Sequence, residues 1–444
     1  MIQIALLLLG MDFIYSRGKY LIFFGSLWSL SGMAIFIDGL DGVVYFPLRF
    51  FGLLLLTESL ISFIVASGHS GGKKILLYFK GGVFCFVSFM ILLNLPSGHF
   101  LLAMVFSFVF FVTGLFMVIS AGVIRFARWR TSFFTGMAQI AFAILMLCPG
   151  PTHYQATVSF FLGTMMFFSG IHTVRFALRV MRRRKKFSLF EFLVPEGTGF
   201  RINKCSGAES ELAEATNADS SEPLVVHIWT PEGTANTSTI RRPVISRYIA
   251  AVDTEGVIST GHAALEVPGS IYISFYPSED IDRSPSEFLK TLKATCDNDV
   301  PGRFQPDYAT EATEWCHSDR KICFTRYNKK SLQSFWDSYR LTQTYNLTRR
   351  NCSGSVAYAL ESALDGVLSE RGKNWLSVIN MLTMPELWIA TQIRKRAISM
   401  TWTPGLVMDY ARALRCIVHS VSAPWYQRLF SRCHGKKKRE LIIL

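Results

Sequence analysis

The seven residues from Arg349 to Ser355, Arg-Arg-Asn-Cys-Ser-Gly-Ser, are the part of the chain best suited to covalent chemistry. Cys352 directly precedes a stretch in which Val356 and Leu360 recur at helical spacing, so the cysteine is predicted to open a helix. The unpaired N–H groups and the dipole at a helix start stabilise a thiolate, and the two neighbouring arginines would add positive charge. Cys352 is therefore a candidate nucleophile, with a buried structural cysteine as the alternative.

A thiol nucleophile needs a base, and the best candidate is His262, which follows Gly261 at the head of the predicted strand 263–267. Pro268-Gly269-Ser270 forms a short turn before a second predicted strand at 271–276, which makes a hairpin. Pairing that hairpin about the turn sets Tyr276 opposite His262 and puts Ser274 on the same face. A hydrogen-bonded strand histidine without a catalytic role is the alternative.

This order, a Gly-His pair opening a strand, a partner strand, and later a helix beginning Asn351-Cys352, resembles the circularly permuted papain-like hydrolases over about residues 224–366. These are relatives of the NlpC-type peptidases and of the lecithin:retinol acyltransferase group. The resemblance implies Cys352 as nucleophile and His262 as base. It also implies a third polar residue on the next strand, where this chain has Tyr276 and Ser274. Neither is the usual His, Asn or Gln of the family, and His227 is a weak substitute.

Further strands are expected at 224–229, 246–252 and 322–327, and helices at 330–341 and 353–364. Strands followed by helices predict an α+β fold. The resemblance implies that this fold is a permuted papain-like domain, at 224–372. The Ser-, Ala- and Glu-rich composition between 204 and 222 predicts a linker over 187–223.

The preceding part, residues 1–186, has the composition of a membrane domain. It contains 16 Lys or Arg but only four acids, and its uncharged stretches are long enough to cross a bilayer. Because Pro149 and Gly150 interrupt the longest stretch, it is interpreted as two helices joined by a turn. An all-α bundle of six transmembrane helices is predicted near 20–38, 46–66, 76–94, 101–123, 131–148 and 156–178. Residues 1–15 are interpreted as an interfacial stretch or an extension of the first helix.

Basic residues alternate between the predicted loops. They precede the first helix and lie between the second and third, between the fourth and fifth, and after the sixth, in the run 182–186. Loops of this kind stay in the cytoplasm, so both termini and the hydrolase-like domain are expected there, at a bacterial inner membrane. In a reducing compartment the cysteines should be free thiols.

The membrane part also repeats. Gly25, Gly81 and Gly136 recur at intervals of 56 and 55 residues, and Glu58, Gly114 and Gly170 at intervals of 56. The period marks three tandem helical hairpins and resembles the HdeD-like family over about residues 15–180. Glu58 departs from the glycine pattern, and no intramembrane basic partner is evident for it. It is either a proton-sensing or transport group, or a carboxyl held neutral or bonded to neighbouring hydroxyls.

Residues 373–444 form a separate basic segment. From 389 onward 11 Lys or Arg stand against two acids, whereas residues 187–388 carry 19 basic and 26 acidic side chains. Apolar side chains such as Trp375, Ile379 and Leu382 accompany this charge. The segment is predicted to be helical and amphipathic, either lying on an anionic membrane surface or packed on the hydrolase-like domain.

Several other chemistries are not supported. Cys296, Cys316, His317 and Cys323 lack the short spacing of a zinc site, and there is no phosphate loop and no Gly-x-Ser-x-Gly motif. Nucleic acid is not an expected partner, because the +14 net charge comes largely from loops of the membrane part. No cofactor is predicted. The sequence predicts a membrane-anchored cysteine peptidase or isopeptidase; the alternatives are a phospholipid acyltransferase or acylhydrolase with the same dyad, and a non-enzymatic membrane stress or binding protein.

Overall fold

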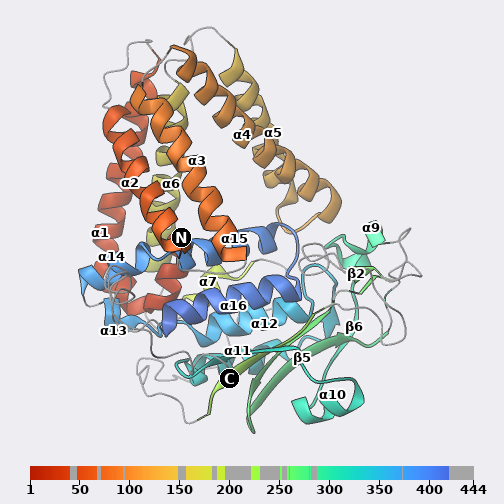
Figure 1. Cartoon of the computed structure of the whole chain (residues 1–444). Helices are drawn as coiled ribbons and strands as arrows, with labels where there is room; N and C mark the ends of the chain where they lie inside the picture. The colour runs from red at the N-terminus through yellow and green to blue at the C-terminus, as the bar shows by residue number, and fades with distance from the viewer. Residues whose placement is uncertain are drawn as a thin grey trace. The chain divides into compact units, whose positions relative to one another are not determined.

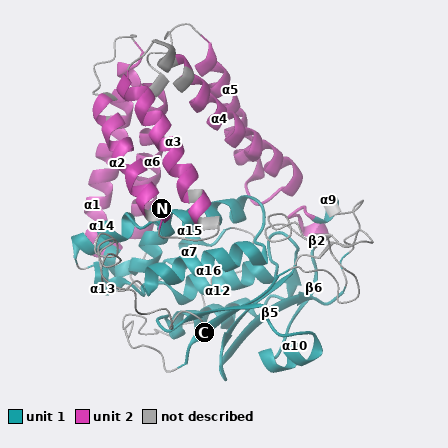
Figure 2. Cartoon of the chain, viewed as in Figure 1, with its two compact units in different colours: residues 1–13, 186–291, 299–444 teal, residues 14–185, 292–298 magenta. Residues whose placement is uncertain are grey.

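A computed structural model gives the fold as two compact units (Figures 1 and 2). Unit 1 comprises residues 1–13, 186–291 and 299–444, and unit 2 comprises residues 14–185 and 292–298. The structure describes residues 1–40, 48–67, 72–93, 96–148, 157–182, 188–195, 222–230, 251–252, 258–259, 261–279, 281, 288–372 and 374–419.

Unit 2 is helical. Five of its helices lie within a few residues of the predicted bounds: α2 (Leu48–Ser67), α3 (Gly72–Leu93), α4 (Pro96–Ile124), α5 (Trp129–Leu147) and α6 (Thr157–Met181). The first, α1 (Ile2–Asp38, shared with unit 1), ends where predicted but begins well before residue 20. The turn expected around Pro149 falls outside the described residues. Within the described ranges, four helical stretches are long and apolar enough to cross a membrane, namely Ile2–Asp38, Ala103–Ile124, Trp129–Leu147 and Ser159–Met181. The chain is therefore a membrane protein.

The repeated glycines lie at helix contacts inside unit 2. A Cβ on Gly114 of α4 would come within 2.7 Å of the carbonyl oxygen of Gly136 on α5. Likewise, a Cβ on Gly170 of α6 would come within 2.6 Å of the carbonyl oxygen of Gly25 on α1. Small residues allow this approach where lipid supplies no hydrophobic drive between helices. The close pairs in the described residues are α2 with α3, α4 with α5 and α1 with α6, so the expectation of three tandem hairpins is wrong: the repeated glycines mark helix crossings between different repeats.

The α2–α3 crossing differs, and here the expectation that Glu58 has no basic partner is wrong. Lys80 Nζ lies 2.5 Å from Glu58 Oε1, and Ser59 Oγ donates to the Gly81 carbonyl at 2.8 Å. Lys80 and Glu58 belong to different helices of one hairpin, 22 residues apart. The α2–α3 crossing therefore has an ion pair and a hydroxyl-to-carbonyl hydrogen bond at the place where the α4–α5 and α1–α6 crossings each have two glycines.

Unit 1 contains an antiparallel sheet with helices, which confirms the α+β class. The six strands are ordered β7-β1-β4-β5-β6-β8. Their bounds are β1 (Leu224–Trp229), β4 (His262–Val267), β5 (Ile271–Pro277), β6 (Val300–Phe304), β7 (Arg320–Phe324) and β8 (Thr344–Tyr345). A separate pair joins β2 (Ala251–Val252) to β3 (Ile258–Ser259). Of the strand expected at 246–252, residues 246–250 lie outside the described residues.

Because side chains alternate along each strand, the sheet has two faces of different composition. One face, which includes the fully buried Leu265 and Ile273, packs against helices. These helices are α11 (Lys329–Tyr339), α12 (Cys352–Ala363) and α16 (Pro404–Val418). The other face carries His262 and Ser274 and is contacted by the short helix α10 (Tyr308–Glu314).

Helix α12 is the centre of unit 1, and each of its residues is buried. Its one buried carboxylate, Glu361, accepts from Arg394 Nε at 2.7 Å and from Tyr410 Oη at 2.9 Å. Arg394 belongs to α15 (Pro385–Ser399) and Tyr410 to α16, so two of the three helices described in the segment expected as a basic tail are tied to α12. Most of α16 is buried beside the sheet, which favours the packed alternative for that helix.

Two other segments complete unit 1. Residues 1–13 extend the first helix toward the N-terminus. The helical geometry is interrupted at Gly10, whose φ of 77° is outside the helical region. The Leu7 and Leu8 carbonyls accept from the N–H groups of Gly366 and Leu368 at 2.9 and 2.7 Å. In the segment expected as a linker, α7 (Phe190–Leu193) is held by Asp365, which accepts from the Phe190 N–H at 3.2 Å. The remaining short helices of unit 1 are α9 (Phe288–Thr291), α13 (Ser369–Gly372) and α14 (Trp375–Leu382), whereas η1 (Cys296–Asn298) belongs to unit 2.

Candidate active site

Cys352 is the first residue of α12, as predicted, and the residue before it fixes the helix start. Asn351 has extended backbone angles, and its Oδ1 accepts from the Gly354 N–H at 2.7 Å, which is an N-cap. The amide of Asn351 also donates to the carbonyls of Leu347 at 2.8 Å and Trp402 at 2.9 Å. The helix start is thus anchored from both sides, so the position of the thiol is fixed.

The structure brings His262 to Cys352, although the two residues are 90 positions apart. Gly261 has φ of 68°, a left-handed conformation that favours glycine, and it turns the chain into β4 at His262. Burial raises the pKa of the Cys352 thiol, but the charge of His262 and a hydrogen bond to it act in the opposite direction. Hydrogen bonds to the Ser353 side chain and to the Ala263 backbone act in the same direction, and the net result is a pKa below the usual value.

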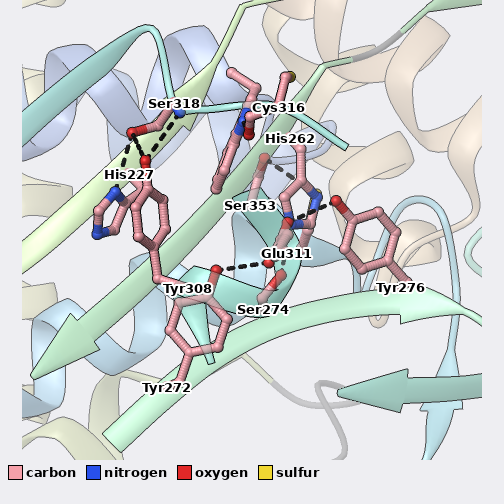
Figure 3. A network of polar contacts seen from close by, with 12 residues as sticks. His227, His262, Tyr272, Ser274, Tyr276, Tyr308, Glu311, Cys316, Ser318 and Ser353 are labelled. Carbon is pink, nitrogen blue, oxygen red and sulfur yellow. Dashed lines mark hydrogen bonds and ion pairs between the residues drawn. The ribbon is translucent and has the colours of Figure 1, made fainter. Parts of the chain in front are cut away.

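The second ring nitrogen of His262 is held by two groups on the same sheet face. His262 Nε2 lies 2.8 Å from Ser274 Oγ and 3.4 Å from Glu311 Oε1 (Figure 3). Ser274 pairs with Ala264 in the β4–β5 ladder, so the register predicted from the hairpin is observed. Because Nε2 is occupied by these contacts, Nδ1 is the ring nitrogen left to accept a proton. A carboxylate on the far side of the ring stabilises the imidazolium that forms when the thiol gives up its proton.

Tyr276 lies against His262 but does not hydrogen-bond to it. Its ring stacks on the imidazole with a centroid separation of 4.1 Å and an interplanar angle of 18°. Its hydroxyl donates to Glu311 Oε1 at 2.7 Å, and Tyr272 donates to Glu311 Oε2 at 2.6 Å. Burial, followed by the charge of Glu311, raises the pKa of Tyr276, so the phenol stays a donor. Tyr276 therefore positions both the ring and the carboxylate.

Glu311 is the residue that the sequence reasoning missed. It is only 1% exposed and comes from α10, a seven-residue helix of mixed polarity. The sequence signal for this helix is local: Asp307 is its N-cap and accepts a hydrogen bond from the Thr310 N–H. That pattern predicts a helix start, but it contains nothing about where the helix packs.

The two arginines before the nucleophile do not act as expected. Arg349 forms an ion pair with Asp299. Arg350 is buried, donates to the carbonyls of Tyr339 and Thr342, and lies 4.1 Å from the centroid of the Tyr339 ring. The charge that lowers the pKa of Cys352 comes from His262 instead. The side chains of consecutive residues before a helix extend in different directions. Arg349 and Arg350 therefore do not direct their charges toward the same atom.

His227, considered as a substitute third residue, serves a different cluster. Its ring nitrogens lie 3.0 Å from Ser318 Oγ and 2.9 Å from Glu266 Oε2, and its ring stacks on Tyr308 at 4.1 Å (Figure 3). Burial, with the charge of Lys321, lowers the pKa of His227 to about 4, so the imidazole is neutral at physiological pH. Because Tyr308 begins α10, this cluster fixes the helix that carries Glu311.

An aromatic wall of Trp229 and Trp315 borders the histidine. Trp229 is buried with its ring centroid 5.4 Å from that of His262, and Trp315 stacks on Trp229 at 5.6 Å while remaining 51% exposed. An exposed indole beside the reactive pair gives a planar apolar surface on which a substrate group can lie.

The start of α12 also supplies donors. The Gly354 N–H is taken by the Asn351 side chain and the Ser355 N–H by the Asn351 carbonyl. The N–H groups of Cys352 and Ser353 therefore remain as helix-start donors without a partner in the described part of the chain. Backbone donors beside a nucleophile can stabilise the oxyanion of a tetrahedral intermediate.

No group of three or more His, Cys, Asp or Glu side chains within the described ranges is arranged to hold a metal ion. A comparison of the chain with protein-family models, with curated proteins and with solved structures gave no match.

Proposed function

We propose that unit 1 is a thiol hydrolase of the permuted papain-like kind. The observation that carries this proposal is the position of His262 beside the Cys352 thiol at a helix start, where the histidine lowers the pKa of the thiol while its Nε2 contacts Ser274 and Glu311. A nucleophile, a base and a group that orients the base are the parts that such chemistry requires.

The reaction follows from these positions. His262 Nδ1 takes the thiol proton as the sulfur of Cys352 attacks a carbonyl carbon, and the oxyanion is stabilised by the helix-start N–H groups. The imidazolium then donates the proton to the leaving nitrogen or oxygen, and a thioester forms on Cys352. Water, deprotonated by the same imidazole, attacks the thioester and releases the acid and the thiol.

Peptide or isopeptide cleavage is the leading reaction. Thioester chemistry also allows hydrolysis or transfer of a phospholipid acyl chain, and the four helices long enough to cross a membrane favour that second candidate. We further propose that all six helices of the N-terminal domain cross the membrane, as in HdeD-like proteins, and that unit 1 lies on the cytoplasmic side of a bacterial inner membrane, because the basic loops alternate.

Covalent probes distinguish the two substrate classes. The full chain in detergent should be treated with a peptide acyloxymethyl ketone and, separately, with an acyl β-lactone, and the modified cysteine identified by mass spectrometry. Labelling of Cys352 by the peptide probe, lost in Cys352→Ala but kept in Cys323→Ala, is expected for a peptidase. Preferential labelling by the lactone would establish the lipid candidate, and labelling by neither probe would contradict hydrolysis.

A further inference from the structure

The helix α14 presents an apolar face that unit 1 does not cover. Val378 and Met381 point inward and are buried, whereas Leu376 is 69% and Ile379 is 52% exposed. Eight large apolar side chains in the described part of unit 1 are exposed, and half of them lie on this single short helix: Trp375, Leu376, Ile379 and Leu382. A patch of this kind on a folded unit marks an interaction surface.

The patch lies where the chain leaves unit 1 for its membrane helix. Phe13 is the last residue of the first segment of unit 1, and its ring meets that of Trp375 edge-to-face with centroids 6.4 Å apart. A Cβ on Gly372, three residues before Trp375, would come within 2.9 Å of the Phe13 ring. The helix to which Phe13 belongs, α1 (Ile2–Asp38), is long and apolar enough to cross a bilayer. Within unit 1, therefore, the start of α14 packs against Phe13, the last residue of the segment that leads into the rest of α1.

We propose that α14 lies in the membrane interface beside α1, with the side chains of Leu376 and Ile379 among the lipid acyl chains. The composition of the patch fits that layer: a tryptophan at one end and aliphatic side chains along the exposed face. A protein partner would need a surface at this same depth, which lipid already occupies. The inference depends on α1 crossing the membrane and is independent of the chemistry of Cys352.

This placement connects the membrane to the nucleophile. Beyond α14 the chain continues through α15, which is 15 residues or about 22 Å long, to Thr401 and Trp402. The side chain of Thr401 and the carbonyl of Trp402 both accept from the Asn351 amide that caps the helix of Cys352. One continuous segment thus runs from the proposed lipid contact to the cap of the catalytic helix.

Site-specific photo-crosslinking in the full chain tests the proposal. A benzoylphenylalanine is introduced at Leu376 and, as the matched control, at Leu341, which is 70% exposed elsewhere in unit 1. Both proteins are reconstituted into vesicles of phosphatidylcholine and phosphatidylglycerol, irradiated and analysed by mass spectrometry. Lipid adducts should be at least about tenfold more abundant at position 376 than at position 341. Equal adduct yields, crosslinks from position 376 to residues 14–185, or crosslinks to a second copy would each overturn the lipid assignment.

Discussion

Replacing Glu311 with Gln tests whether the carboxylate behind His262 contributes to catalysis. The substitution keeps the shape of the side chain but removes its charge. At the 3.4 Å that separates Glu311 Oε1 from His262 Nε2, a charge pair is worth about 5 kcal/mol at an effective dielectric constant of about 20. Ser274 still contacts the ring in the variant, so we expect a loss of about 2–4 kcal/mol of transition-state stabilisation. That corresponds to a fall in kcat/KM of roughly 30- to 1000-fold.

The same substitution should change the thiol directly. Without the carboxylate the imidazolium is less stable, so the pKa of Cys352 rises and the rate of its alkylation by iodoacetamide falls at neutral pH. Glu314→Gln on the same helix is the matched control, because Glu314 is exposed. Tyr272→Phe controls for stability, since it removes a hydrogen bond from Glu311 without touching His262. An alkylation profile for Glu311→Gln that matches the control would refute the electrostatic role of Glu311.

Three further predictions concern the scaffold. Asn351→Ala should destabilise unit 1 by about 2–3 kcal/mol in thermal unfolding, because the cap and two buried donor contacts are lost; an unchanged Tm would contradict the anchoring of the helix start. Burial and the charge of Asp365 raise the pKa of Glu191 from 4.5 to about 7, so the folded state retains a proton and its stability falls as pH rises through that range. Glu191→Gln should therefore be about 1–3 kcal/mol more stable than the parent at pH 8 and nearly equal to it at pH 4, and a difference independent of pH would disagree. Lys80→Met should lower the unfolding temperature in detergent more than the double change with Glu58→Gln, because the single change leaves a charge without its partner.

Local signals were enough to predict that Cys352 starts a helix and that His262 starts a strand. Asn351 before Cys352 and Gly261 before His262 are features of a few consecutive residues, and backbone geometry alone converts them into a helix start and a strand start. The hairpin register followed from the short turn about Gly269, so the positions of Ser274 and Tyr276 on the face of His262 were also predictable.

What could not be predicted depends on packing between distant segments. Glu311 reaches His262 only because α10 packs on the sheet, and nothing in its own sequence indicates that face. The partner of Glu58 was missed for the same reason, since Lys80 lies on the next helix of the hairpin. For the arginines beside Cys352, closeness in sequence was misleading. Arg350 was expected to add positive charge at the thiol, but it donates to the carbonyl of Tyr339 instead.

The most direct test of the central claim is the alkylation rate of Cys352 as a function of pH in the parent chain and in His262→Ala. The modified site is read by mass spectrometry against Cys323 as an internal reference, and unfolding is monitored to confirm that the variant keeps its fold. The account predicts that Cys352 in the parent reacts faster than Cys323 near neutral pH, and that His262→Ala moves the midpoint for Cys352 to higher pH while leaving Cys323 unchanged. A Cys352 profile that is the same in both proteins would contradict the thiol–imidazole pair.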